Sequence, residues 1–215
     1  MIDKDSRKLL AGLYLAALVI SILFYFLVPC PWVKWPVIVL ALWFCAWQTW
    51  FFRVPRRSCG TTEGSVMSIV DGRVVICEKA YEPEVLRAEC WQVSVYMNFF
   101  DVHANFWPVS GTVLSYDYHP GAHMFAFEPK SSLKNEHTCV KLEYLGREIL
   151  FKQVAGGFAR RIVCHAAPGQ KTVAGAQCGI IKFGSRLDLF LPLDADIKVQ
   201  KGQIVRACET IIAQM

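Results

Sequence analysis

The feature that most constrains this chain is a run of twenty uncharged, mostly apolar residues near its N-terminus, Leu9–Val28. As a helix rising 1.5 Å per residue, the run measures about 30 Å, the thickness of the hydrocarbon core of a bilayer. It is longer than the apolar part of a secretory signal peptide, and no small-residue cleavage site follows it. The run therefore predicts a membrane anchor.

A second apolar run, Val37–Phe52, follows a proline-rich break at residues 29–36. Basic residues precede the first run and follow the second, and the positive-inside tendency then places both ends in the cytoplasm. We expect residues 1–57 to form a helical hairpin in the cell (inner) membrane, with the rest of the chain on the cytoplasmic face. Because sixteen residues are short for a span, one span followed by an interfacial helix is the alternative.

The charge of the chain is concentrated at this N-terminal segment. Seven basic residues against two acidic residues give residues 1–57 a net charge of +5, whereas sixteen residues of each sign leave residues 58–215 neutral. A nucleic-acid-binding protein would carry its positive charge on the folded domain. The distribution favours a membrane surface with anionic headgroups as the partner and excludes nucleic acid.

Residues 58–215 read as a mostly β (α+β) domain. Short runs with alternating apolar residues include 91–99 and 187–191, and residues 140–153 read as a hairpin. One helix is expected, Glu82–Glu89, with Pro83 in its first turn. We predict a β-barrel or sandwich, and the C-terminal strands are similar to the repeating element of lipoyl- and biotinyl-type domains.

Neither the cysteines nor the histidines have the spacing of a metal site. The chain has nine cysteines and no CxxC pair, which favours free thiols in a reducing compartment. His119 and His123 are four residues apart, but Pro120 and Gly121 between them do not fit a helical zinc pair. We therefore expect no metal.

Three polar residues lie in apolar surroundings on separate elements. Ser185 follows Gly184 between two strand-like runs, His103 ends another such run, and Asp71 is in an Asp-Gly turn. A serine, a histidine and an aspartate of this kind can act as a nucleophile, its base and the carboxylate that orients the base. The residue types alone leave this open, because Asp-Gly is also an ordinary tight turn.

Several motifs, in order along the chain, resemble those of short-class phosphatidylserine decarboxylase proenzymes. The segment around Ser185 resembles the self-cleavage site of that family. The matching segments are Phe51-Phe52-Arg53, Ser68–Gly72, Asp101–Asn105 with Pro108–Gly111, Asn135-Glu136, Ala155–Ile162 and Phe183-Gly184-Ser185-Arg186.

The resemblance implies that the chain cuts itself between Gly184 and Ser185, giving a larger chain, 1–184, and a smaller one, 185–215. Ser185 would attack the carbonyl of Gly184, His103 would take the proton, and Asp71 would hold the imidazole. Residue 185 would become a covalent pyruvoyl group, the cofactor, and would form a Schiff base with phosphatidylserine. Loss of CO2 would then give phosphatidylethanolamine.

The resemblance also implies partners. The substrate is an anionic phospholipid, the enzyme is membrane-bound, and a homodimer is expected. The substrate carboxylate and phosphate need cationic partners, for which Arg186, Arg160, Arg161 and His123 are the candidates.

Two other readings stay open at this point. A membrane-anchored β-sandwich adaptor without catalytic activity would remain one intact chain with an unreactive Ser185. A pyruvoyl decarboxylase acting on another lipid with a serine headgroup would cleave itself in the same way.

Overall fold

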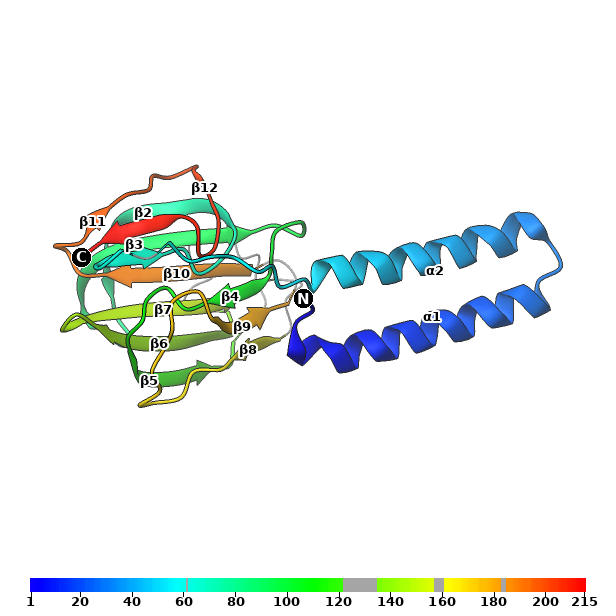
Figure 1. Ribbon diagram of the computed structural model, residues 1–215, viewed down its shortest axis with the longest axis horizontal. Helices are drawn as coiled ribbons and strands as arrows, with labels where there is room; N and C mark the ends of the chain where they lie inside the picture. The colour runs from blue at the N-terminus through cyan, green and yellow to red at the C-terminus, as the bar shows by residue number, and fades with distance from the viewer. Residues whose placement is uncertain (61, 122–134, 157–160, 183–184) are drawn as a thin grey trace. The chain divides into compact units, whose positions relative to one another are not determined.

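A computed structural model describes residues 1–60, 62–121, 135–156, 161–182 and 185–215 (Figure 1). The chain divides into two compact units, Met1–Pro55 and Arg56–Met215. The division falls two residues before the boundary expected from the sequence.

The N-terminal unit is a pair of helices, α1 (Arg7–Leu27) and α2 (Pro31–Phe51), preceded by a short 3₁₀ turn, η1 (Lys4–Ser6). The Tyr14 hydroxyl lies 2.5 Å from that of Thr49, which donates to the Cys45 carbonyl. The two ends of the unit also meet, because the Val54 N–H donates to the Met1 carbonyl (2.6 Å). The helices therefore run antiparallel, as a hairpin does.

The second helix is longer than the sequence predicts. Pro31 occupies its first turn, where proline is tolerated, and Pro36 lies inside it. A proline this close to a helix start removes one hydrogen bond without ending the helix. Of the described helices, Lys4–Leu27 alone has the length and composition of a membrane span. It supports association with a membrane, while the two-span hairpin stays a prediction.

The second unit consists of strands, which fall into three sheets. The strands are β1 (Ser65–Met67), β2 (Gly72–Glu82), β3 (Ala88–Met97), β4 (Ala104–Phe106), β5 (Thr112–His119), β6 (His137–Tyr144), β7 (Arg147–Ala155), β8 (Ile162–Cys164), β9 (Gln177–Ile181), β10 (Ser185–Leu191), β11 (Asp196–Ile197), β12 (Ile204–Val205) and β13 (Ile211–Gln214). The largest sheet has the order β12-β2-β3-β10-β7-β6-β5, and the smaller ones are β1-β13-β11 and β4-β9-β8.

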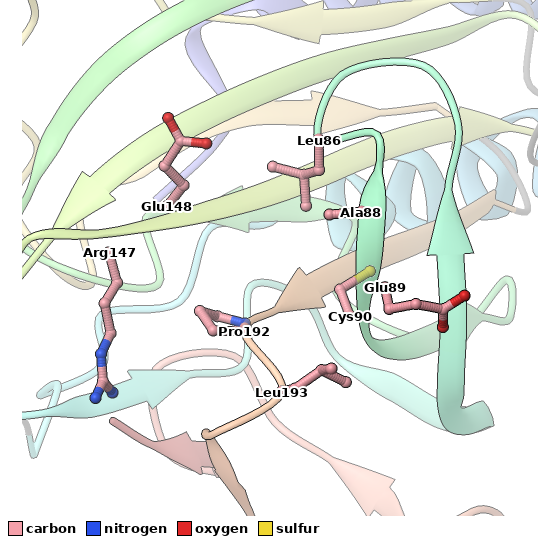
Figure 2. Close-up of a pocket in the computed structure, with 8 residues that line it drawn as sticks. All are labelled: Leu86, Ala88, Glu89, Cys90, Arg147, Glu148, Pro192 and Leu193. Atoms are coloured by element: carbon pink, nitrogen blue, oxygen red, sulfur yellow. The ribbon is translucent and has the colours of Figure 1, made fainter.

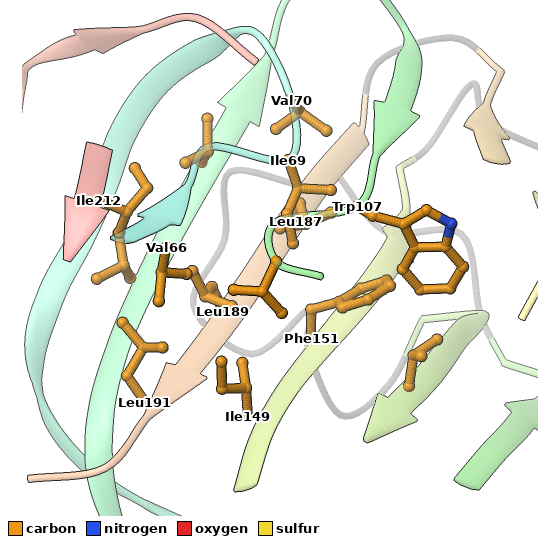
Figure 3. Packing of buried hydrophobic residues seen from close by; sticks show 14 of the residues in the cluster. Val66, Ile69, Val70, Trp107, Ile149, Phe151, Leu187, Leu189, Leu191 and Ile212 are labelled. Carbon is orange, nitrogen blue, oxygen red and sulfur yellow. The ribbon is translucent and has the colours of Figure 1, made fainter. Parts of the chain in front are cut away.

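The hydrophobic core lies between one face of the seven-stranded sheet and the two small sheets. Leu187 and Leu189 of β10 and Phe151 of β7 pack there with Val66 of β1 and Ile212 of β13 (Figure 3). Alternating side chains point to opposite faces of a strand, so the alternating leucines of residues 187–191 share the core face, and the residues between them are buried on the other face of β10. The mostly-β sandwich prediction is confirmed, and the expected hairpin at 140–153 is β6 and β7.

The helix predicted at Glu82–Glu89 is wrong. β2 continues to Glu82 and β3 begins at Ala88, with a single turn between them. The Glu82 carboxylate accepts hydrogen bonds from the backbone N–H groups of Glu84, Val85 and Leu86, which closes the turn. Arg87 then adopts a positive φ of 50°, which ends any helical path.

Candidate active site

Ser185 is the first residue of β10, in the middle of the seven-stranded sheet. It is in register with Met97 of β3 on one side and Ala155 of β7 on the other. The side chain is completely buried, and its Oγ donates weakly to Sδ of Met97 (3.9 Å). The preceding residue of the expected cleavage site, Gly184, lies outside the described residues. Ser185 is thus fixed by two neighbouring strands.

Strand alternation separates Ser185 from the arginine that follows it. Ser185 and Leu187 point toward the core, so Arg186 and Asp188 point to the opposite face of the sheet. Arg186 is fully buried, and its Nε lies 2.8 Å from Oδ1 of Asp188. As a ligand for substrate anions, Arg186 would have to leave this ion pair and reach around β10.

His103 lies immediately before β4, and its imidazole is completely buried. Its Nδ1 lies 3.0 Å from the carbonyl oxygen of Asp101. Because a carbonyl oxygen only accepts hydrogen bonds, Nδ1 carries a proton, and in the neutral ring Nε2 carries the lone pair. This is the tautomer that a general base needs.

A chain of buried amide groups places β4 above the face of the sheet that carries Ser185. The Asn105 amide donates to the His103 carbonyl (3.2 Å) and accepts from Nε2 of Gln153 (2.6 Å). Gln153 is in register with Leu187, so it shares the face of Ser185. The structure therefore brings His103 and Ser185 to the same side of the sheet.

The Asp71-Gly72 turn lies at the same end of the sheet as Ser185. Arg73 is in register with Tyr96, which is in register with Arg186, so Gly72 is level with Ser185. Gly72 has a φ of +155°, and a Cβ there would collide with the Tyr96 carbonyl oxygen. The turn thus requires glycine for a close approach of two backbones.

Asp71 has a partner that the sequence did not reveal. Both carboxylate oxygens accept from the guanidinium of Arg57, with Nη2 2.7 Å from Oδ2, and Oδ1 also accepts from the Ala207 N–H (2.9 Å). The hydrogen bond to Asp71 raises the pKa of Arg57, although burial opposes this. Among the described residues, Asp71 therefore pairs with Arg57, and the expected bond to His103 stays a prediction.

Asn135 and Glu136 hold the end of β7 beside Ser185. The Asn135 amide donates to the Ala155 carbonyl (2.7 Å), and the Ala155 N–H donates to the Glu136 carbonyl (2.9 Å). Since Ala155 is the register partner of Ser185, these bonds fix the strand against which Ser185 lies. The Asn135-Glu136 motif therefore positions the strand next to Ser185, a role that the sequence alone does not reveal.

The remaining predicted ligands for substrate are only partly described. Arg161 is exposed just before β8, whereas Arg160 and His123 lie outside the described residues. Sequence reasoning missed Arg57, Gln153 and Met97. None of them belongs to a motif with a spacing rule, and only the strand register brings them to the site.

Three side chains resemble a metal-binding set by composition but not by geometry. Donor atoms of His119, His137 and Cys139 lie within 4.8 Å of one another. The two imidazole rings are stacked, with centroids 4.6 Å apart and planes at 10°. An ion about 2.1 Å from one nitrogen and in the plane of its ring would lie outside the plane of the other ring. Burial also raises the pKa of Cys139 to about 12, which disfavours the thiolate.

A cavity of about 390 Å³ lies far from Ser185. Its lining includes Cys90, Arg147 and Leu193 (Figure 2). Leu193 lies two residues beyond the last residue of β10, whereas Ser185 is the first, so about 20 Å of strand separates them. This cavity does not belong to the candidate active site.

Comparison with known proteins gives a consistent result. The sequence model of the family described as phosphatidylserine decarboxylase matches residues 44–213. A phosphatidylserine decarboxylase proenzyme of Amoebophilus asiaticus is 44% identical over 170 residues, covering 79% of this chain and 76% of that protein. Proteins of the same name from Nitrosomonas eutropha and Bacteroides fragilis are 36% and 34% identical, each covering 100% of this chain and 95% of the relative.

Proposed function

Because the chain belongs to the phosphatidylserine decarboxylase family, we propose that Ser185 is the residue at which it cleaves and activates itself, with His103 as the base. The family reaction converts phosphatidylserine to phosphatidylethanolamine and CO2. The observation that carries the assignment is the position of Ser185: buried, at the start of a central strand, on the face of the sheet over which His103 lies.

Self-cleavage begins with the serine hydroxyl. Ser185 Oγ attacks the Gly184 carbonyl, its proton passes to Nε2 of His103 and then to the departing amide nitrogen, and an ester replaces the peptide bond. Elimination takes the Cα proton of residue 185 and breaks its Cβ–Oγ bond, which frees chain 1–184 as a carboxylate. One water then hydrolyses the remaining enamine, releases ammonia and leaves a pyruvoyl group at residue 185.

The surroundings of Ser185 fit such a group. A pyruvoyl unit is no larger than serine, and the neighbouring strands β3 and β7 hold residue 185 through its own register. When formed, the pyruvoyl carbonyl supplies the electron sink that decarboxylation of an amino acid requires. Once Nε2 of His103 has taken up a proton, His103 returns it to the carbon that loses CO2.

Substrate binding and location belong to the same proposal. Arg161 is the described candidate for the substrate anions, with Arg160 and His123 as further candidates. The basic residues that flank the two apolar runs favour the cytoplasmic face of the membrane for the second unit. We also propose a homodimer, to be tested by native mass spectrometry of the detergent-purified protein.

Intact mass under denaturing conditions tests the assignment. The purified chain should separate into residues 1–184 and a chain of 31 residues (215 − 184). The smaller chain should react with hydroxylamine or borohydride at its N-terminus, and Ser185→Ala should remain full-length. An unbroken parent chain with an ordinary serine at 185 would refute the proposal and would favour an adaptor without catalytic activity.

A further inference from the structure

Two adjacent phenylalanines are exposed on the loop that joins β3 to His103. The exposed fraction is 36% for Phe99 and 70% for Phe100. The loop is a closed turn: the Asn98 N–H donates to the Asp101 carboxylate (2.8 Å) and the Phe100 N–H to the Asn98 side chain (2.7 Å). The aromatic rings are therefore presented by a backbone with defined hydrogen bonds.

The loop begins at the active site. Met97, the register partner of Ser185, directly precedes the loop, and His103 follows it by two residues. Phe99 and Phe100 are two and three residues beyond Met97, so their backbone lies at most about 10 Å past it. The backbone of the exposed phenylalanines thus lies within a short reach of the register partner of Ser185.

This short backbone reach is compatible with the thickness of a membrane surface layer. The polar headgroup layer on each side of a bilayer is about 5–8 Å thick, and apolar side chains of peripheral proteins enter the headgroup–acyl boundary. The chain also carries an apolar helix of membrane-spanning length, Lys4–Leu27. If the two rings lie at the headgroup–acyl boundary, the short backbone distance to the active site would bring Ser185 to the level of the lipid headgroups.

We propose that the loop of residues 98–101, the phenylalanine loop, inserts Phe99 and Phe100 into the bilayer beside the active site. The inference rests on the proposed function, because the depth argument needs a phospholipid substrate. A bilayer is favoured over a second protein copy as the occupant because the loop adjoins a site whose substrate is itself a membrane lipid. The N-terminal anchor brings the enzyme to the membrane, and the phenylalanine loop then sets how deeply the active site lies in the membrane surface.

Kinetics on two forms of the substrate test this role. In Phe99→Ser/Phe100→Ser, the phosphatidylserine surface concentration for half-maximal rate on phosphatidylserine/phosphatidylglycerol vesicles should rise about tenfold or more. On monomeric short-chain phosphatidylserine the rate should stay within about twofold of the parent. Tyr81→Ser is the matched control, because Tyr81 is 57% exposed at the opposite end of the β2–β3 pair. It should change neither rate.

The outcomes separate the two proposals. If the Phe99→Ser/Phe100→Ser variant loses activity equally on vesicles and on monomeric substrate, or loses none on vesicles, the proposed role of the loop is wrong. The proposed decarboxylase function would still stand. A parent chain that neither cleaves itself nor releases CO2 from either substrate would instead refute the proposed function.

Photo-crosslinking gives a second measurement, which remains valid even if the Phe99→Ser/Phe100→Ser variant does not fold. p-Benzoylphenylalanine replaces Phe100, or Tyr81 as the control, in full-length protein reconstituted in phosphatidylethanolamine/phosphatidylglycerol vesicles. Irradiation should add the mass of a lipid at position 100 and not at position 81. A cross-link to a second copy of the chain, or equal lipid adducts at both positions, would contradict the proposal.

Discussion

At the scale of single residues, the orientation of His103 is set by the backbone. The Asp101 carbonyl fixes the proton on Nδ1, so the ring needs no carboxylate to present Nε2 as a base. His103→Ala should slow self-cleavage by about 10²–10⁴-fold, the usual contribution of a general base. The half-life of the full-length chain, followed by denaturing electrophoresis after synthesis in vitro, measures this. His165→Ala, at an exposed position, is the control, and cleavage of the His103 variant at the parent rate would exclude the assigned role.

Gly72 provides a second prediction at this scale. A methyl group there would overlap the backbone carbonyl of Tyr96. A backbone carbonyl in a strand cannot move aside by a change of side-chain rotamer. Gly72→Ala should therefore lower the free energy of unfolding by about 1–3 kcal/mol. Urea denaturation of the uncleaved Ser185→Ala protein measures the loss. Gly60→Ala, where a Cβ meets nothing within 4 Å, should cost far less, and equal effects would contradict the argument.

At the scale of elements, the Arg57–Asp71 pair joins the segment before β1 to the turn that precedes β2. Its two side chains are 12% and 13% exposed, so the bidentate pair is more than a surface salt bridge. If Asp71 acts by holding this turn level with Ser185, across β3, then Arg57→Gln and Asp71→Asn should each slow self-cleavage about tenfold, and the double variant little further. Cleavage half-lives measure all three. If Asp71→Asn cleaves itself slowly while Arg57→Gln cleaves itself at the parent rate, Asp71 instead acts on His103 directly.

A buried ion pair fastens the β2–β3 turn to β7 on the outer face of the seven-stranded sheet. Lys152 and Glu82 are 1% and 0% exposed, with Nζ 2.6 Å from Oε1. Burial alone would raise the pKa of Glu82, but hydrogen bonds from Lys152 and three backbone N–H groups bring it below its usual value. Glu82 therefore adds stability above the pKa of about 4.5 that it has when unfolded, and this stability is lost as the pH falls through its lower folded value.

Removing the lysine should reverse this pH dependence. In Lys152→Met the buried Glu82 loses the ammonium group and keeps its three backbone hydrogen bonds, so we expect desolvation to raise its folded pKa above the unfolded value and to penalise the folded state at neutral pH. The loss should be about 3–5 kcal/mol near pH 7 and should shrink as the pH falls. Urea denaturation between pH 4 and 7 measures it. Lys141→Met, which breaks the more exposed pair with Glu148, should cost under about 1 kcal/mol, and a pH-independent loss at Lys152 would contradict the account.

The same elements show how far the sequence predicts this fold. The short turn between two strand-like runs predicts the β6–β7 hairpin, and Leu145 and Gly146 both adopt the positive φ that such a turn needs. The Glu82–Glu89 segment has helix-forming residues. Its conformation nevertheless depends on the ion pair of Glu82 with Lys152, seventy residues away, and on the backbone hydrogen bonds that the Glu82 carboxylate accepts. Ser185 and His103 could be found because they belong to motifs. Arg57 could not, because nothing in a sequence marks which arginine a turn aspartate will meet.

At the scale of the whole molecule, the strand order predicts what self-cleavage does to the fold. The 31 residues after the expected cut contain β10, which lies between β3 and β7, and β13, which lies between β1 and β11. Cleavage would therefore free one end of β10 without removing a strand from any sheet. The small chain should co-elute with the large one on size exclusion in detergent, and separate only when the protein is unfolded.

Cleavage should also change how unfolding depends on concentration. Once the chain is in two pieces, unfolding releases two molecules, so the midpoint of thermal unfolding should rise with protein concentration by mass action. The Ser185→Ala chain stays in one piece, so a monomeric preparation of it should show no such dependence. Calorimetry of both proteins over a hundredfold range of concentration makes the comparison. Loss of the small chain in native buffer, or a concentration-independent midpoint in fully cleaved protein, would show that β10 does not hold the two chains together as the sheet order requires.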